Sequence, residues 1–475
     1  MPGFHGAMMV ALETAGAGRE HLPAVPFGVT LFFTFLLVAM IAALALEEKL
    51  HAKKSLIVGI FGIATLFLGE VFHLIPRGPL LFGGEEIEIP VYIPAIDWGV
   101  IAIILGSSLF VDVASRSGLF TWSAIKLTKL SGGDPRKLLW FYGWMTVIFS
   151  AVLNNVTAMI IVGSLTVVSL EKLGQGEKLL PFLLIEGLLT NIGGLLTLIS
   201  SVPNIIVGST AGITFLAFFL RASPFVLLAT VLTLLAGGKR FGIRPLPTEE
   251  TRKEAALRVA AFDENDGVTS KGFFWFSTVM LAAFIVCIAA TSVLPYVREL
   301  GMGFVALAFA IVMLVRYKAQ VDQFYRAVDW DLLAFFAALF VVINVMEHAG
   351  VLALIGRGVS RLIGAGENAF GSGALLLSSA LFSSVTDNIP LSAMLAKILA
   401  ARGTESSSPL WWAVVFGANL GGNLTPIGSA STLVAVTIML KQKLPMSFLG
   451  FVGHAFPFAV LQILLAMAYV LLALA

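Results

Sequence analysis

LTNIGGLLTLISSVPNIIV (residues 189–207) and GANLGGNLTPIGSAST (residues 417–432) are apolar stretches interrupted by Gly-Gly pairs, Asn, Ser and Thr. Glycine lets the backbone turn without a Cβ clash, so each stretch can break a helix. A lipid bilayer offers the freed N–H and C=O groups no partner, and such breaks survive only inside protein or beside a watery cavity. Both stretches therefore predict interrupted helices buried within a membrane protein.

The composition supports this reading. Of 475 residues, 58% are hydrophobic and 12% are charged, whereas a soluble domain of this size needs a charged exterior. The net charge of +2 gives no indication of a nucleic-acid partner, and the single cysteine excludes an internal disulfide. Apolar runs long enough to cross or half-cross about 30 Å of hydrocarbon cover residues 28–46, 55–75, 98–114, 138–170, 179–200, 203–220, 222–237, 273–294, 302–315, 330–346, 373–402, 409–440 and 447–475.

Three segments of the first half recur in the same order in the second half, at a nearly constant offset of 228 to 233 residues. The matching pairs are AIDWGVIA (95–102) with AVDWDLLA (327–334), FSAVLNNV (149–156) with FSSVTDNI (382–389), and NIGGLLTLISS (191–201) with NLGGNLTPIGS (419–429). Chance similarity between apolar sequences is the alternative, and the shared order and offset disfavour it.

Basic residues predict opposite topologies for the two halves, because lysine and arginine favour cytoplasmic loops. They gather after the first apolar run, after residue 114, in segment 238–272 and before residue 329. The span that starts near Asp97 then enters from outside, and the span that starts near Asp329 enters from the cytoplasm. Inverted repeats with interrupted helices and a midplane site are the plan of many secondary transporters.

Each half supplies two polar breaks whose side chains and unwound carbonyls can coordinate an ion. In the first half they are Asn154, Asn155 and Thr157, followed by Asn191, Gly193, Gly194 and Thr197. In the second half they are Asp387 and Asn388, followed by Asn419, Gly421, Gly422, Asn423 and Thr425.

Asp387 is the first candidate for cation binding and proton exchange, because a carboxylate within the bilayer is costly and usually faces a cavity. The alternative is a structural carboxylate satisfied by helix N-terminal amides. Glu186 is a second candidate for proton coupling, and its alternative is a carboxylate paired near the cytoplasmic end of its helix. Asp97 and Asp329 occupy matched positions at the starts of spans, where we expect them to cap helices.

These motifs resemble the ion-transporter (ArsB/NhaD) superfamily, which includes NhaD-type sodium/proton antiporters, arsenite efflux permeases, citrate transporter-like proteins and the pink-eyed dilution P protein. The closest phrases are SAVLNNVTAMI, LTNIGGLLTLISSVPNIIV, VDWDLLAFFAALFV, SSVTDNIPLSAML and GANLGGNLTPIGSAST, within residues 95–475. The resemblance implies an all-α, polytopic membrane protein with two inverted-topology repeats, each with a re-entrant hairpin and a broken helix, as a homodimer.

The resemblance also implies a division of the chain and further site residues. The regions are N-terminal scaffold helices (1–94), transport repeat 1 (95–237), a cytoplasmic linker (238–272), scaffold helices of the second half (273–326) and transport repeat 2 (327–475). Within the linker, Thr251 and Glu254 fit a capping box before a short helix. The broken helices are extended by Ser200, Ser201 and Asn204 in the first half and by Ser429 and Ser431 in the second.

The sequence departs from the family's patterns at the hairpin tips. The P protein has an aspartate where this chain has Asn154, which leaves Asp387 as the main acidic candidate. Dicarboxylate carriers of the superfamily have Ser-Asn-Thr signatures, whereas the tips here read Asn-Asn-Val-Thr and Asp-Asn-Ile-Pro. Dicarboxylate transport is therefore disfavoured.

We expect a secondary active sodium/proton antiporter in the plasma membrane of a prokaryote, working by alternating access. Sodium would be the substrate ion, held by Asp387, Asn155 and Asn388, and we expect no cofactor. The alternative is an arsenite or small-anion permease of the same superfamily, and a channel stays open as a third class. The chain has no Walker motif and no clustered catalytic set, which argues against an ATPase or an intramembrane enzyme.

Overall fold

The computed structural model describes residues 25–75, 80–82, 85–87, 89–90, 92–364 and 368–474. The helices of the first half are α2 (Phe27–Ala45), α3 (Glu47–Leu50), α4 (Lys54–Val71), α5 (Tyr92–Ala95), α6 (Trp98–Ser115), α7 (Leu119–Ser131), α8 (Pro135–Val152), α9 (Asn155–Lys172), α10 (Leu179–Gly193), α11 (Val202–Ala211) and α12 (Phe215–Arg240). Those that follow are α13 (Glu249–Ala260), α14 (Lys271–Ala290), α15 (Val297–Arg316), α16 (Val321–Ala327), α17 (Trp330–His348), α18 (Val351–Ile363), α19 (Ala369–Ser383), α20 (Asn388–Ala401), α21 (Pro409–Gly421), α22 (Ala430–Lys441) and α23 (Phe448–Ala473).

The architecture confirms a polytopic helical membrane protein. Within the described residues, nine helices are long and apolar enough to cross a bilayer. Their outer faces carry large apolar side chains, such as Phe35 at 69% and Ile63 at 75% exposure, which suit hydrocarbon and not water. One addition to the all-helical prediction is a short antiparallel pair of strands, β1 (Leu80–Phe82) with β2 (Glu85–Ile87), in the connection after α4.

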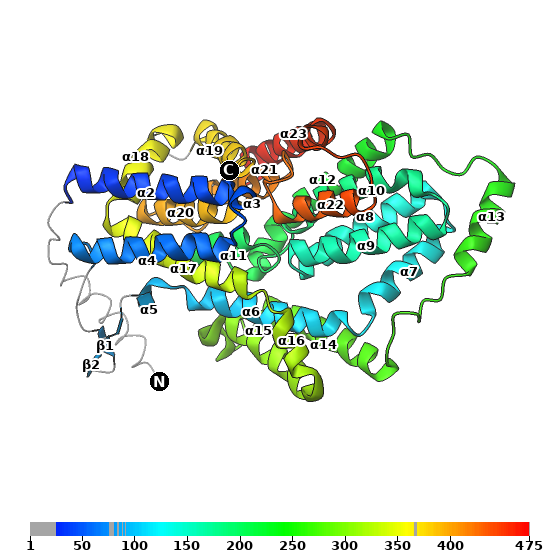
Figure 1. Cartoon of the computed structure of the whole chain (residues 1–475), viewed down its shortest axis with the longest axis horizontal. Helices are drawn as coiled ribbons and strands as arrows, with labels where there is room; N and C mark the ends of the chain where they lie inside the picture. Colours follow the sequence, from blue (N-terminus) through cyan, green and yellow to red (C-terminus); the bar gives the residue numbers. More distant parts are fainter. Residues whose placement is uncertain are drawn as a thin grey trace.

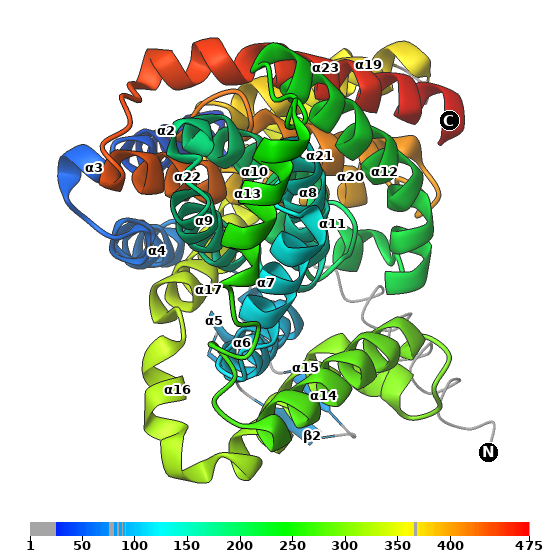
Figure 2. The same cartoon turned by 90° about the vertical axis from the view of Figure 1, so that its right-hand side faces the viewer.

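Helices from the two halves pair reciprocally. Helix α6 packs on α15 and α17 packs on α4, and α2 and α14 flank these pairs. We call α2, α3, α4, α6, α14, α15 and α17 the scaffold layer. We call α8–α12 and α19–α23 the hairpin bundle. Figure 2 shows α6, α14 and α15 below this bundle.

Each half contributes one helical hairpin and one broken helix to this bundle. The hairpins are α8–α9 and α19–α20, and the broken helices are α10–α11 and α21–α22. Figure 1 shows the first hairpin on the right and the second on the left, on opposite sides of the centre. The two hairpins therefore enter the bundle from opposite sides, as inverted repeats require.

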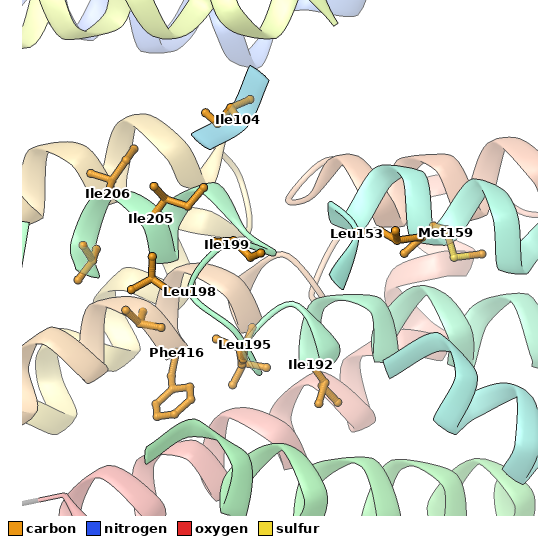
Figure 3. Close-up of a cluster of buried hydrophobic side chains, with 14 of the residues drawn as sticks. Ile104, Leu153, Met159, Ile192, Leu195, Leu198, Ile199, Ile205, Ile206 and Phe416 are labelled. Atoms are coloured by element: carbon orange, nitrogen blue, oxygen red, sulfur yellow. The ribbon is translucent and has the colours of Figure 1, made fainter. Parts of the chain in front are cut away.

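Apolar packing fixes the first break in place. Ile192 lies in the last turn of α10, and Leu195 and Leu198 follow in the non-helical segment (Figure 3). All three side chains are completely buried. Ile205 and Ile206 of α11 belong to the same cluster. A backbone that leaves the helix at a glycine pair is thus surrounded by hydrophobic side chains, and its polar groups must find partners within the protein.

Two local predictions need correction. The runs 203–220 and 222–237 do not form two helices that meet near residue 221, because α12 starts at Phe215 and continues through Pro224. The carbonyl of Leu220, which the proline leaves without an N–H donor, accepts a hydrogen bond from Ser223 Oγ at 3.5 Å. In the linker, α13 begins before Thr251, and Thr248 is its N-cap.

Ion pairs attach the linker to α7. Glu264 Oε2 is 2.7 Å from Lys129 Nζ of α7, and Glu264 Oε1 is 3.6 Å from Lys126 Nζ. The hydrogen bond from Lys129 lowers the pKa of the Glu264 carboxyl below its usual value. Such partly exposed pairs orient a segment more than they stabilise a fold.

Candidate functional site

A cavity of about 880 Å³ lies where the two hairpins meet the scaffold layer. Both hairpin tips line it, through residues 154–157 and 387–389, and so do both breaks, through residues 200–203 and 427–431. The scaffold layer contributes residues 51–54 and the beginning of α17. The structure thus brings together four motifs that the sequence places far apart.

The first tip is neutral and bonded into the neighbouring broken helix. Asn154 Oδ1 accepts a hydrogen bond from the backbone N–H of Thr157 at 2.8 Å and caps α9. Asn155 Oδ1 accepts from Ser150 Oγ at 2.9 Å, and Asn155 Nδ2 donates to Asn191 Oδ1 at 3.3 Å. The amide of Asn155 therefore joins the hairpin to α10.

The second tip is charged and bonded to the scaffold layer. Asp387 Oδ1 accepts from the backbone N–H of Ile389 at 3.0 Å and caps α20, as the structural alternative predicted. Its other oxygen, Oδ2, lies 2.5 Å from Lys54 Nζ at the start of α4. Asn388 also lines the cavity, and its side-chain amide makes no hydrogen bond within the part of the chain that the structure describes.

Asn191 is the centre of a buried polar network between the halves. Its Oδ1 accepts hydrogen bonds from Ser429 Oγ at 2.9 Å and from Ser431 Oγ at 3.0 Å. Its Nδ2 donates to Asn423 Oδ1 at 2.8 Å, and Asn423 Nδ2 donates in turn to Gln462 Oε1 at 2.7 Å. Buried amides with satisfied donors and acceptors hold one specific arrangement of the surrounding helices.

The equivalent asparagine of the second half makes the reciprocal contact. Asn419 Oδ1 accepts from Ser201 Oγ at 2.7 Å, and Asn419 Nδ2 donates to Asn204 Oδ1 at 3.0 Å. Asn204 Nδ2 then donates to the carbonyls of Gly194 and Thr197 at 2.7 and 2.9 Å, which satisfies the unwound backbone of the first break. Each break is therefore completed by residues of the other half.

Threonines attach each break to its own hairpin. Thr197 Oγ1 donates to the carbonyl of Ala151 at 2.5 Å, and Thr425 Oγ1 donates to the carbonyl of Ser384 at 2.5 Å. The two bonds occupy equivalent positions in the repeats and end at carbonyls just before the tips. These threonines therefore position the breaks against the hairpins.

Glycines allow the hairpins to approach the broken helices. A Cβ at Gly193 would lie 2.6 Å from the carbonyl oxygen of Val147 in α8, and one at Gly421 would lie 2.3 Å from that of Ala380 in α19. Both distances are too short for any larger residue. The close contact is the same in the two halves, which explains why the glycine pairs recur.

Glu186 lies outside the cavity. Its carboxylate is buried in α10, where Oε1 accepts a hydrogen bond from Thr166 Oγ1 at 2.7 Å. Its Oε2 has no hydrogen-bond partner among the described residues. The predicted pairing near the helix end is therefore replaced by a single hydroxyl contact in the middle of the bundle. Its proposed role in proton coupling stays a prediction.

The cavity contains charged residues that sequence reasoning did not assign to the site. Its carboxylates are Glu47, Asp112, Asp329, Asp331 and Asp387, and its ammonium groups are Lys53 and Lys54. Asp97 and Asp329 cap their helices as predicted, through the N–H groups of Val100 and Leu332. In the sequence, Lys54 served only as a basic residue that predicts a cytoplasmic loop. Its partner Asp387 lies 333 residues away, and no local pattern relates the two.

Comparison with known proteins assigns the chain to a family. A protein-family model described as "Citrate transporter" matches residues 43–417. The chain belongs to this citrate transporter family. An uncharacterized transporter of Mycobacterium bovis is 30% identical over 380 residues, which cover 79% of this chain and 86% of that protein. The mouse P protein is 25% identical, and the match covers 90% of this chain and 61% of the P protein.

Solved structures share the fold of this family member. The YdaH transporter of Alcanivorax borkumensis aligns with a TM-score of 0.57 and 15% identity, covering 88% of this chain and 98% of that one. MtrF of Neisseria gonorrhoeae aligns with a TM-score of 0.55 and 14% identity, covering 89% and 95%. The chain is accordingly a secondary transporter embedded in a lipid bilayer, not an enzyme, and the predicted relationship to the P protein is confirmed.

Proposed function

We propose that this transporter exchanges sodium for protons by alternating access, with Asp387 as the group that binds either ion. The observation that carries the proposal is the charge of the cavity, which five carboxylates and two ammonium groups line within the described part of the chain. Such an excess of negative charge attracts a cation and repels a polyanion.

The chemistry of the tips supports a small, hard cation. Sodium is bound by oxygen ligands, and the cavity offers the carboxylate of Asp387 and the side-chain carbonyls of Asn155 and Asn388. Ser429 also lines the cavity and offers a hydroxyl. A proton on Asp387 would remove the charge that binds sodium, so the two ions compete for one group.

The second candidate substrate is citrate or another small anion, including arsenite. The family description and the ammonium groups of Lys53 and Lys54 favour it. Against it, a free citrate trianion would have to enter among five carboxylates. We also propose that the protein is a homodimer in a prokaryotic plasma membrane, which native mass spectrometry and fractionation of the source cells would test.

A proteoliposome assay with a pH-sensitive dye in the lumen tests the proposal. We expect sodium or lithium to cause proton movement, and Asp387→Asn to abolish it, because the amide cannot exchange a proton. Asp97→Asn is the matched control, since it makes the same change at a helix cap outside the cavity and asparagine caps as well as aspartate.

Two results would contradict the antiporter proposal. The first is the absence of any sodium- or lithium-dependent proton signal from folded wild-type protein. The second is uptake of labelled citrate or arsenite that Asp387→Asn abolishes while sodium has no effect. Glu186→Gln in the same assay separates the two proton candidates, because loss of proton movement with retained sodium binding would assign the proton to Glu186.

A further inference from the structure

The ammonium group of Lys54 lies between carboxylates from two parts of the fold. Its Nζ is 2.5 Å from Oδ2 of Asp387 on the second tip and 3.9 Å from Oε2 of Glu47 in the scaffold layer. The next residue, Ser55, donates a hydrogen bond to Asp331 of α17. The side chains of Lys54 and Asp387 are 31% and 13% exposed, so salt screens the pair less than an open surface pair.

This ion pair connects two groups of helices that pack mainly within themselves. Helix α4 packs on α2 and α17, whereas α20 packs on α11 and α21. Among the ion pairs of the described residues, one other joins the second hairpin to the scaffold layer, from Lys397 to Glu347 at 3.2 Å. Those side chains are 48% and 45% exposed and do not line the cavity.

We propose that Lys54 is a coupling latch. Its ammonium group occupies the cation position on Asp387 in the empty carrier and holds the ionised tip against the scaffold layer. A sodium ion or a proton on Asp387 cancels the charge that attracts Lys54, so either one releases the tip. This inference rests on the proposed function and assigns the residue that prevents uncoupled return of the empty carrier.

The physical basis is the cost of separating the two charges. Withdrawing the ionised Asp387 from Lys54 would leave a carboxylate to cross the bilayer without a counter-ion. With sodium or a proton bound, the tip moves as a neutral unit. Lys54 then stays in the scaffold layer beside Glu47, 3.9 Å away, so its own charge keeps a partner. The other titratable groups that line the cavity are His51, Lys53, Asp112 and Asp329.

Two modes of ²²Na⁺ flux from proteoliposomes test the latch. One is exchange against external sodium, and the other is net efflux into sodium-free medium at the same alkaline pH on both sides, where few protons are available for the return of the carrier. In Lys54→Gln we expect the ratio of net efflux to exchange to rise about tenfold, because the empty tip is no longer held. Lys54→Arg should restore the wild-type ratio, and Lys397→Gln should leave it unchanged. An unaltered ratio in Lys54→Gln overturns the proposal.

Hydrogen exchange at the second tip gives a readout that does not depend on the identity of the substrate. In sodium-free buffer, peptides that contain Asp387 should exchange about tenfold faster in Lys54→Gln than in wild type, and Lys397→Gln should match wild type there. Equal exchange in Lys54→Gln and wild type overturns the latch. Absence of sodium flux from wild type, combined with the faster exchange, overturns the antiporter proposal and leaves the latch standing.

Discussion

The first hairpin tip ends on amides that bond into α10, whereas the second ends on a carboxylate that bonds to the scaffold layer. Asn155 contacts Ser150 and Asn191 within its own half. Asp387 instead contacts Lys54, and its neighbour Asn388 leaves its amide unused within the described structure. The two tips occupy equivalent positions in the repeat, so the difference lies in side chains and not in the backbone framework.

The features that the two repeats share serve the fold, whereas the feature that differs between them serves transport. The glycine contacts and threonine hydrogen bonds are the same in both halves, because both hairpins must pack against broken helices. The charge is present at one tip only. We infer that the shared framework sets stability and that the second tip determines ion coupling.

The largest expected effect comes from breaking the shared framework. Gly193→Ala and Gly421→Ala should each lower the free energy of unfolding by about 2 kcal/mol or more, because each new Cβ meets a backbone carbonyl. The measurement is thermal unfolding in detergent. Gly59→Ala in α4 is the control, since nothing lies within 4 Å of its Cβ position. A loss in only one of the two halves would contradict the symmetry of the framework.

An intermediate effect should distinguish the two tip amides. Asn155→Ala should lower the free energy of unfolding by about 1–2 kcal/mol, since it removes the two side-chain hydrogen bonds that Asn155 makes with Ser150 and Asn191. Asn388→Ala should change stability by less than about 0.5 kcal/mol and weaken sodium binding about tenfold. Thermal unfolding measures the changes in stability, and calorimetric titration with sodium measures the change in affinity. The reverse pattern would show that the first tip is the ion-binding one.

The smallest expected effect comes from making the tips alike. Asn154→Asp should keep the cap of α9 and stabilise its helix by about 0.3–1 kcal/mol, because a negative charge is favourable at a helix N-terminus. The added charge in the cavity should strengthen apparent sodium affinity on the order of twofold, since water screens it. Transport assays at several sodium concentrations measure this. A tenfold or larger gain would mean that the tips contribute equally.

The sequence was sufficient for the repeat, the four polar motifs and the membrane location of the chain. Each depends on local pattern, such as Gly-Gly beside Asn in an apolar run, or on the same pattern appearing twice. It failed at Pro224, because α12 continues through this proline, where Ser223 Oγ lies 3.5 Å from the carbonyl oxygen of Leu220. It did not indicate the partner of Glu186, because Thr166 is on another helix.

By itself, the sequence determined that this is a two-fold repeated, helical membrane transporter with one carboxylate at its hairpin tips. Side-chain chemistry and spacing alone carry that information. Only the tertiary structure decided that Lys54 pairs with Asp387, that Asn191 contacts Ser429, and that one cavity contains both tips. These contacts join residues hundreds of positions apart, and their geometry follows from how the helices pack, which no local pattern records.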